Sequence, residues 1–189
     1  MKKKPQITEQ TKKNIVEAFW SIYKEKDISQ ITVTETINKA GYNRATFYNY
    51  FYNVQSILDY IEDEIIESFK EIALKQPLFS GLNQPLLNDL LKLYEIYGEY
   101  FTVLLSEHGD PQFPVKIKNM IKPIYYAKLN EKYPNDFKTE IILEYTTSAL
   151  ISAFLLWSKN KNSMNSNDFF EFIDYLMNHG TKKTFDKYF

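Results

Sequence analysis

The sequence contains no cysteine in 189 residues, and its two histidines, His108 and His179, lie far apart. Without thiols the chain can form no disulfide framework, thiolate nucleophile or cysteine-ligated metal site. Two isolated imidazoles do not suffice for a metal site, so we expect none. The five glycines form no loop that could cradle a phosphate. These absences argue against an enzyme and predict a protein without a cofactor.

Long hydrophobic runs are also missing. The most apolar window, residues 149–157, is far shorter than the roughly 20 residues needed to cross a bilayer. The N-terminus carries Lys2, Lys3 and Lys4 followed by polar residues, unlike the apolar segment of a signal peptide. Apolar residues make up 44% of the chain and charged residues 25%, a balance typical of globular proteins. We therefore expect a cytoplasmic protein without a membrane partner.

The net charge of -1 conceals an asymmetry along the chain. Residues 1–52 carry nine Lys or Arg against five Asp or Glu, a net of +4, and residues 53–189 carry 14 against 19, a net of -5. A basic N-terminal part on an acidic body indicates a polyanionic partner for the N-terminal part alone. Most charged runs are only solvated faces, so charge by itself is weak evidence for nucleic acid.

Hydrophobic periodicity predicts helices almost everywhere. Apolar side chains recur every three or four residues in 8–25. Thr32 and Glu35 have the spacing of a capping box, which would open a short helix ending at Gly41. Asn43 can cap the next helix. Further helices are predicted from Asn53 to about 72 and over about 87–105, 114–132, 137–158 and 167–179.

The most informative span joins two short helices through Ala40-Gly41-Tyr42. This arrangement fits a helix-turn-helix, in which one helix braces across the DNA backbone and the next lies in the major groove. Phe47 and Phe51, four residues apart, would anchor the second helix in the core. Hydroxyls can donate hydrogen bonds to phosphates, and arginine and asparagine can make bidentate hydrogen bonds to guanine and adenine, respectively. The side chains left facing outward are Arg44, Ala45, Thr46, Tyr48, Asn49 and Tyr50.

This span resembles the DNA-binding domain of the tetracycline-repressor (TetR) family. The resemblance rests on Thr32-Val33, Ala40-Gly41, the run Thr46-Phe47-Tyr48-Asn49-Tyr50-Phe51, and Leu58. It implies an all-α protein with a three-helix DNA-binding domain over residues 1–52 and a helical-bundle domain for effector binding and dimerisation over 53–189. Residue by residue, it assigns base contact to Arg44, Ala45 and Asn49, mainly phosphate contact to Thr46, Tyr48 and Tyr50, and a further contact to Thr32.

Two positions depart from the family pattern. Val54 stands where a basic residue is usual, so one phosphate contact is missing, for which Lys2 to Lys4 would compensate as a basic arm. Thr36 stands where an apolar core residue is common. In the C-terminal part, Leu104 to Phe113 and Lys116-Ile117-Lys118 resemble the TetR branch that includes dihydroxyacetone-kinase regulators. Some members of that branch activate transcription.

The resemblance further implies a homodimer built from the last two long helices. The run 149–157 is too apolar to face water, and pairing with a second copy would cover it. We expect the dimer interface to contain Leu150, Phe154, Leu155, Phe169, Phe172 and Ile173. Aromatic residues on two body helices, the second interrupted by Pro123, could enclose a small, mainly apolar effector. The candidate ligand-binding residues are Tyr94, Tyr97, Phe101, Met120, Ile121 and Tyr125.

The sequence thus predicts a transcriptional regulator, most simply a repressor that leaves a palindromic operator when a small molecule binds. Two alternatives remain open: an activator, or a co-regulator that has lost DNA binding and acts through a partner protein. The modest charge of the N-terminal part and Val54 support the second alternative. An enzyme with an attached DNA reader lacks any catalytic constellation in the sequence.

Overall fold

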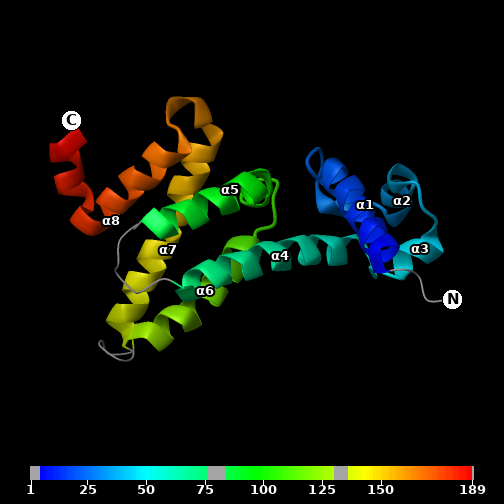
Figure 1. Cartoon of the computed structure of the whole chain (residues 1–189), viewed down its shortest axis with the longest axis horizontal. Helices are drawn as coiled ribbons and strands as arrows, with labels where there is room; N and C mark the ends of the chain where they lie inside the picture. The colour runs from blue at the N-terminus through cyan, green and yellow to red at the C-terminus, as the bar shows by residue number, and fades with distance from the viewer. Residues whose placement is uncertain (1–4, 76–83, 130–135, 189) are drawn as a thin grey trace. The chain divides into compact units, whose positions relative to one another are not determined.

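The computed structural model describes residues 5–75, 84–129 and 136–188, and every regular element in these ranges is a helix (Figure 1). The predicted all-α fold is therefore confirmed. The chain divides into two compact units, Met1–Ile65 and Ile66–Phe189, which we call the head and the body. The predicted basic arm of Lys2, Lys3 and Lys4 lies outside the described residues.

The head consists of four helical segments and the first half of a fifth. They are α1 (Pro5–Tyr23), the 3-10 turn η1 (Ile28–Gln30), α2 (Val33–Ala40), α3 (Arg44–Tyr48) and the start of α4 (Val54–Lys75). Ile15 and Phe19 from α1, Phe47 from α3 and Ile57 from α4 are fully buried. Burial of large apolar side chains from separate helices holds these short elements together, because helices this short are marginal by themselves.

The division between head and body falls inside α4, whereas the sequence predicts it at residue 52, before this helix. Ile57, Leu58, Ile61 and Ile65 recur along α4 at helical spacing and are buried. The ring of Tyr60 also packs against Phe51 at a centroid distance of 6.0 Å. The first three turns of α4 therefore belong to the core of the head.

The body contains the second half of α4 and four further helical elements. These are α5 (Gln84–Leu104), α6 (Phe113–Leu129), α7 (Phe137–Lys159) and α8 (Ser166–Tyr188), with the 3-10 turn η2 (Lys161–Ser163) before α8 (Figure 1). The last helix extends past the predicted end at 179, but Gly180 interrupts it with φ 74° and ψ 169°. Residues 181–188 then form a separate helical segment.

The core of the body is largely aromatic. Trp157 lies at its centre, with ring centroids 4.8 Å from Tyr94, 5.7 Å from Phe154 and 4.5 Å from Phe169. The indole Nε1 donates a hydrogen bond to the carbonyl of Met164 at 2.8 Å, so burial leaves no unsatisfied donor on this ring. This cluster joins α5, α7 and α8.

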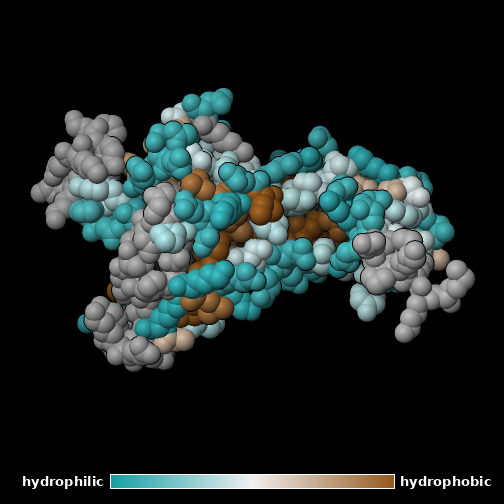
Figure 2. Space-filling view, in the orientation of Figure 1, coloured by the Kyte–Doolittle hydropathy of each residue, from teal (hydrophilic) through white to brown (hydrophobic). Residues whose placement is uncertain are grey.

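The first part of α7 exposes apolar side chains to solvent. Ile141, Ile142, Tyr145 and, further along, Leu156 are all more than half exposed in the single chain. Helix α7 is also the one described helix whose length and composition would permit a membrane span, but these criteria are equally met by core helices. The space-filling view shows hydrophobic patches among hydrophilic ones on the body (Figure 2). This uncovered α7 face is a surface suited to protein contact.

Candidate nucleic-acid interface

Helix α2 begins with a side-chain cap. The Thr32 hydroxyl accepts a hydrogen bond from the backbone N–H of Glu35 at 3.1 Å, as the sequence predicts. The Glu35 carboxylate was expected to reach back to Thr32, but it pairs with Lys26 at 2.6 Å. The capping box is thus realised in one direction, and the Glu35 carboxylate ties the start of α2 to the segment that follows α1.

The turn between α2 and α3 depends on Gly41, whose φ of 75° and ψ of 28° lie in the left-handed region. The following amide of Tyr42 donates to the carbonyl of Ile37 at 3.0 Å. Asn43 then opens α3, because its side-chain oxygen accepts from the amide of Thr46 at 2.9 Å. Together these bonds fix the direction in which α3 leaves the turn.

The two faces of α3 differ sharply. Phe47 is completely buried, and its ring lies 6.0 Å from that of Phe51. The opposite face exposes Arg44, Ala45, Asn49 and the phenol ring of Tyr48, which is 55% exposed. Thr46 and Tyr50 are half-buried beside it, and Thr32 is exposed at the start of α2. All seven predicted DNA contacts thus lie in one unit with surface still accessible, and their contacts with DNA remain a prediction.

The departure at Thr36 has a clear structural answer. This side chain is fully buried, and its hydroxyl donates to the carbonyl of Thr32 at 3.0 Å. A buried hydroxyl with a hydrogen-bond partner costs little, so it can replace an apolar residue without opening the core.

Helix α4 begins without the usual basic residue. The Asn53 side chain accepts from the amide of Ser56 at 2.9 Å, and the Ser56 hydroxyl accepts from the amides of Asn53 and Tyr52 at 3.2 and 3.1 Å. This reciprocal cap orders the start of α4. Val54 adds no charge to it.

Two tyrosines that the sequence analysis did not assign lie next to this surface. Tyr52 is 88% exposed immediately before α4. The Tyr42 hydroxyl accepts a hydrogen bond from Asn14 at 2.9 Å, which leaves its own proton available for another acceptor. Their positions beside the motif were visible in the sequence, but exposure and hydrogen bonding could be known only from the fold.

The predicted ligand-binding residues occupy different environments in the body. The Tyr94 ring packs against Phe154 and Trp157, and Phe101 is buried against Phe113. These two side chains fill the core. Tyr97 is half-buried, and its hydroxyl lies 3.4 Å from that of Ser68.

On α6, Met120, Ile121 and Tyr125 are half-buried. Burial raises the pKa of the Tyr125 phenol, so this side chain stays a neutral donor. Together with Tyr97, these residues are the ones with surface left for a ligand.

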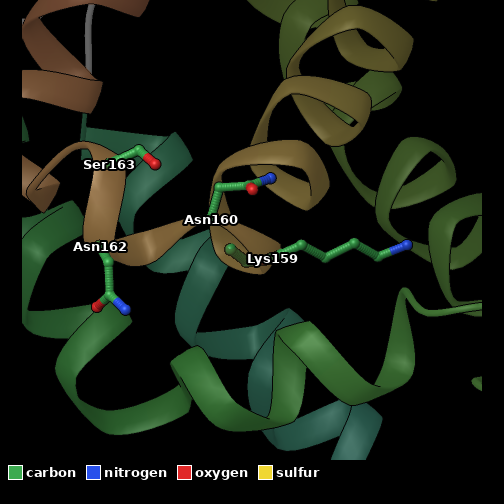
Figure 3. A pocket seen from close by; sticks show the side chains of 5 residues that line it. Lys159, Asn160, Asn162 and Ser163 are labelled. Carbon is green, nitrogen blue, oxygen red and sulfur yellow. The ribbon is translucent and has the colours of Figure 1, made fainter.

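Two polar features of the body lie outside those residues. An open hollow of about 500 Å³ at the end of α7 is lined by Ser158, Lys159, Asn160, Asn162 and Ser163 (Figure 3). Two of its polar side chains are already bonded to backbone carbonyls, Ser158 to Leu155 and Asn160 to Leu156.

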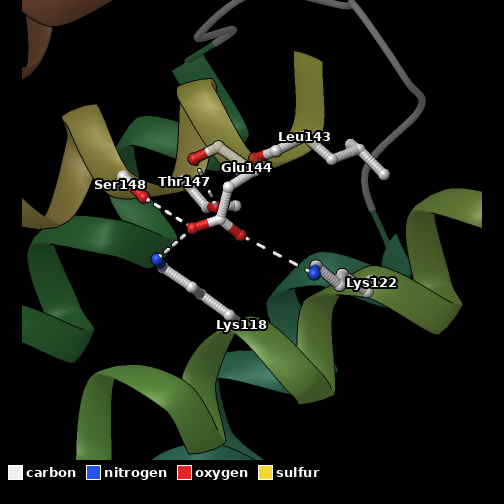
Figure 4. Close-up of polar contacts among 6 residues, drawn as sticks. All are labelled: Lys118, Lys122, Leu143, Glu144, Thr147 and Ser148. Carbon is white, nitrogen blue, oxygen red and sulfur yellow. Dashed lines mark hydrogen bonds and ion pairs between the residues drawn. The ribbon is translucent and has the colours of Figure 1, made fainter. Parts of the chain in front are cut away.

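The second feature links α6 to α7. Glu144 accepts from Lys118 at 2.5 Å and from Ser148 at 3.1 Å, and its other oxygen lies 3.6 Å from Lys122 (Figure 4). The hydrogen bond from Lys118, and then that from Ser148, lower the pKa of the Glu144 carboxyl. The carboxylate is therefore the form that holds these two helices together.

The predicted dimer-interface residues divide between buried and half-buried positions. Phe169 and Ile173 are buried, and Phe154 packs against Trp157 and Phe101. Leu150 and Phe172 are partly buried against the same cluster, and Leu155 is half-buried. Phe154, Phe169 and Ile173 therefore contribute to the core of the body. Leu150, Leu155 and Phe172 keep part of their surface, and contact of these residues with a second copy stays a prediction. Periodicity could not reveal this, because α7 is apolar on most sides.

Comparison with known proteins finds similarity to transcriptional regulators. A family model described as a transcriptional regulator C-terminal region, TetR_C_8, matches residues 83–179. The HTH-type dhaKLM operon transcriptional activator DhaS of Lactococcus lactis subsp. lactis (strain IL1403) is 25% identical over 145 residues, 74% of this chain and 75% of that protein.

Solved structures agree on the fold. A TetR transcriptional regulator from Streptococcus agalactiae 2603V has a TM-score of 0.63 and 25% identity, covering 90% of this chain and 95% of its own. The fatty acid degradation regulator FadR from Bacillus halodurans has a TM-score of 0.64 at 16% identity, covering 96% and 99%. A structure of the dihydroxyacetone kinase operon activator DhaS has a TM-score of 0.54 at 19% identity, covering 93% and 97%.

Proposed function

Because this chain belongs to the TetR family of transcriptional regulators, we propose that it binds a palindromic DNA operator as a homodimer through α2 and α3. The observation that carries the proposal is the two-faced α3. Phe47 anchors it in the core, while Arg44, Ala45 and Tyr48 remain exposed on the outer face of α3, after the turn that Gly41 makes. A protein of this kind would act in the cytoplasm.

In this proposal some of the accessible side chains contact bases and others contact phosphates. Arg44 would contact guanine, Asn49 adenine, and Ala45 a base edge in the major groove. Thr46, Tyr48 and Tyr50, with Thr32 on α2, would donate to phosphate oxygens and set the register. Tyr52, exposed before α4, would supply a further phosphate contact where Val54 cannot.

The uncovered face of α7 supports the homodimer. Ile141, Tyr145 and Leu156 would be covered by the same residues of a second copy about a two-fold axis. Two recognition helices related by that axis fit half-sites about 34–36 Å apart, or a multiple of this distance. The operator would therefore be palindromic.

A small-molecule effector would bind in the body. Tyr97, Met120, Ile121 and Tyr125 retain surface that a mainly apolar or aromatic molecule could contact, whereas Tyr94 and Phe101 would shape the wall from within the core. The effector would have to bind the DNA-competent and released forms with different affinities in order to shift their equilibrium.

Repression is the simplest outcome, since a bound dimer would block access to the operator. Activation is the second candidate, because the relative DhaS is described as a transcriptional activator. Transcription in vitro from a promoter carrying the selected operator would separate the two: repression lowers the transcript level and activation raises it.

The proposal is tested by selecting bound sequences from a random DNA pool with the full-length protein. We expect an enriched palindrome and a binding constant that falls steeply with added salt. Arg44→Ala should reduce preference at particular base pairs by about 1–3 kcal/mol. Lys159→Ala, in the body, should leave the selected sequence unchanged. A folded dimer that enriches no sequence and binds no DNA at low salt would instead favour a co-regulator acting through a partner protein.

A further inference from the structure

Arg44 is the only arginine in the chain, and its guanidinium contacts a neighbouring helix. The Nη2 atom of Arg44, at the start of α3, donates a hydrogen bond to the hydroxyl of Thr34 on α2 at 3.1 Å. Both side chains are exposed. The contact therefore joins the bracing helix to the recognition helix on the solvent side of the motif.

The position of the Thr34 hydroxyl is well determined by the backbone. Thr34 lies in the first turn of α2, whose start is fixed by the cap between Thr32 and Glu35. The turn at Gly41 and the hydrogen bond from Tyr42 to Ile37 fix α3 relative to α2. Threonine in a helix has two main rotamers, and the one present here places its hydroxyl against Arg44. Thr34 thus presents an oxygen at a set place beside a long and otherwise flexible side chain.

The hydrogen bond leaves the guanidinium able to read a base. Arginine carries five N–H donors, two of them on Nη2, and the bond to Thr34 uses one. Enough donors remain for a bidentate contact with the O6 and N7 atoms of guanine.

We infer that Thr34 is a positioning residue, which orients Arg44 before DNA binds and so sharpens its preference for guanine. The inference rests on the proposed function. Holding a rotamer-rich side chain in its bound geometry reduces the entropy lost on association. The same constraint disfavours other geometries in which the guanidinium would contact a phosphate or another base. Loss of the Thr34 hydroxyl should therefore lower discrimination more than general affinity for DNA.

The experiment compares Thr34→Val, which keeps the shape and removes the hydroxyl, with Thr34→Ser, which keeps the hydroxyl. Binding constants are measured for full-length protein on the selected operator, on the operator with the guanine opposite Arg44 replaced, and on unrelated DNA. We expect Thr34→Val to lose about 3- to 10-fold in operator affinity, with little change on unrelated DNA. Thr34→Ser should restore most of the discrimination. Thermal unfolding would verify that both variants are folded.

A double-mutant cycle with Arg44→Ala supplies the decisive readout. If Thr34 acts through Arg44, Thr34→Val should have no further effect on discrimination in the Arg44→Ala background. An equal effect in both backgrounds, an equal loss on all DNA, or unchanged discrimination in Thr34→Val would overturn the inference while leaving sequence-specific binding intact. Failure of the wild-type protein to select any sequence would overturn the proposed function as well.

Discussion

The indole of Trp157 and the ring of Phe169 stack with their centroids 4.5 Å apart and their planes 12° from parallel. Trp157 lies in the last turn of α7 and Phe169 in the first turn of α8, so the stack joins the two ends of the loop between these helices. The hydrogen bond from the indole to the Met164 carbonyl, within that loop, fixes the same ring at its polar edge. The Trp157 side chain therefore both packs its ring in the core and supplies a hydrogen-bond donor to the loop.

Trp157→Ala should destabilise the body by about 3–5 kcal/mol, because it removes a buried ring and leaves the Met164 carbonyl without its indole donor. The free energy of unfolding, measured with denaturant, would show the loss. Ile96→Ala, at an exposed position on α5, is the control and should change stability by only about 0.5 kcal/mol or less. Equal effects at the two positions would contradict the packing described for Trp157.

Gly41→Ala should destabilise the head by about 1–2 kcal/mol, because a side chain makes the left-handed backbone conformation unfavourable. Apart from the adjacent residues of the chain, a Cβ at Gly41 would meet no atom within 4 Å, so the cost arises from the local backbone conformation and not from packing against other parts of the head. Gly41→Asn should cost less, since asparagine tolerates this conformation better. Thermal unfolding of the three proteins should give unfolding temperatures that fall from the wild type to Gly41→Asn to Gly41→Ala. An alanine variant as stable as the wild type would show that the turn does not require positive φ.

If the chain forms the proposed homodimer, replacing Ile141 and Tyr145 together with aspartate should dissociate it while each chain stays folded. The two side chains lie one turn apart on α7, and Tyr145 is 71% exposed in the single chain. Charges buried at a two-fold interface would face their own copies and remain unpaired. Sedimentation velocity at micromolar concentration would report the change, and operator binding should weaken with it.

Two comparisons make the dimer experiment specific. Ile96→Asp, on the exposed side of α5, should leave the dimer intact. Phe154→Asp should instead unfold the body, because Phe154 lies in the aromatic core. A wild-type protein that sediments as a monomer, or a doubly substituted protein that remains a dimer, would exclude this face of α7 as the interface.

Glu144→Gln should lower stability at neutral pH by weakening the contacts of α7 with Lys118 and Lys122 on α6. The Glu144 pKa is lower in the folded protein than in the unfolded chain, mainly because of the Lys118 hydrogen bond. Its contribution is therefore fully present above the ordinary carboxyl range and is lost as the pH falls through the lowered value.

Denaturation midpoints of the wild type and of Glu144→Gln should converge in acid. Glu140→Gln, one turn earlier on the same helix and also exposed, provides a matched removal of charge. At neutral pH the midpoint of Glu140→Gln should differ less from that of the wild type than the midpoint of Glu144→Gln does. A difference for Glu144→Gln that persists unchanged in acid would show that the carboxylate charge is not responsible.

Local signals in the sequence were sufficient for the elements of the head. The cap at Thr32, the left-handed Gly41 and the cap at Asn43 each act within four residues, so residue type and spacing predict them. The all-α fold followed in the same way from periodicity. Glu35 shows the limit of local reasoning: its carboxylate pairs with Lys26, which lies nine residues away.

The body was less predictable because its contacts join distant residues. Leu150, Phe154 and Phe169 are apolar residues on helices with several apolar sides, and the sequence alone could not decide which side faces the core. In the structure Phe169 lies in the aromatic cluster of the body, and Leu150 and Phe154 pack against this cluster. The contact of Arg44 with Thr34 joins exposed side chains ten residues apart across the turn, and no periodic pattern indicates it.

The two tryptophans of the chain divide between its two units. Trp20 is buried in the head on α1, and Trp157 is buried in the body on α7. Each unit therefore carries its own intrinsic fluorophore. In a Trp157→Phe protein the tryptophan emission reports the head alone, and in a Trp20→Phe protein it reports the body alone. If, within one of these proteins, the emission shifts to the red at a different denaturant concentration from the loss of helix, the two units unfold in separate steps.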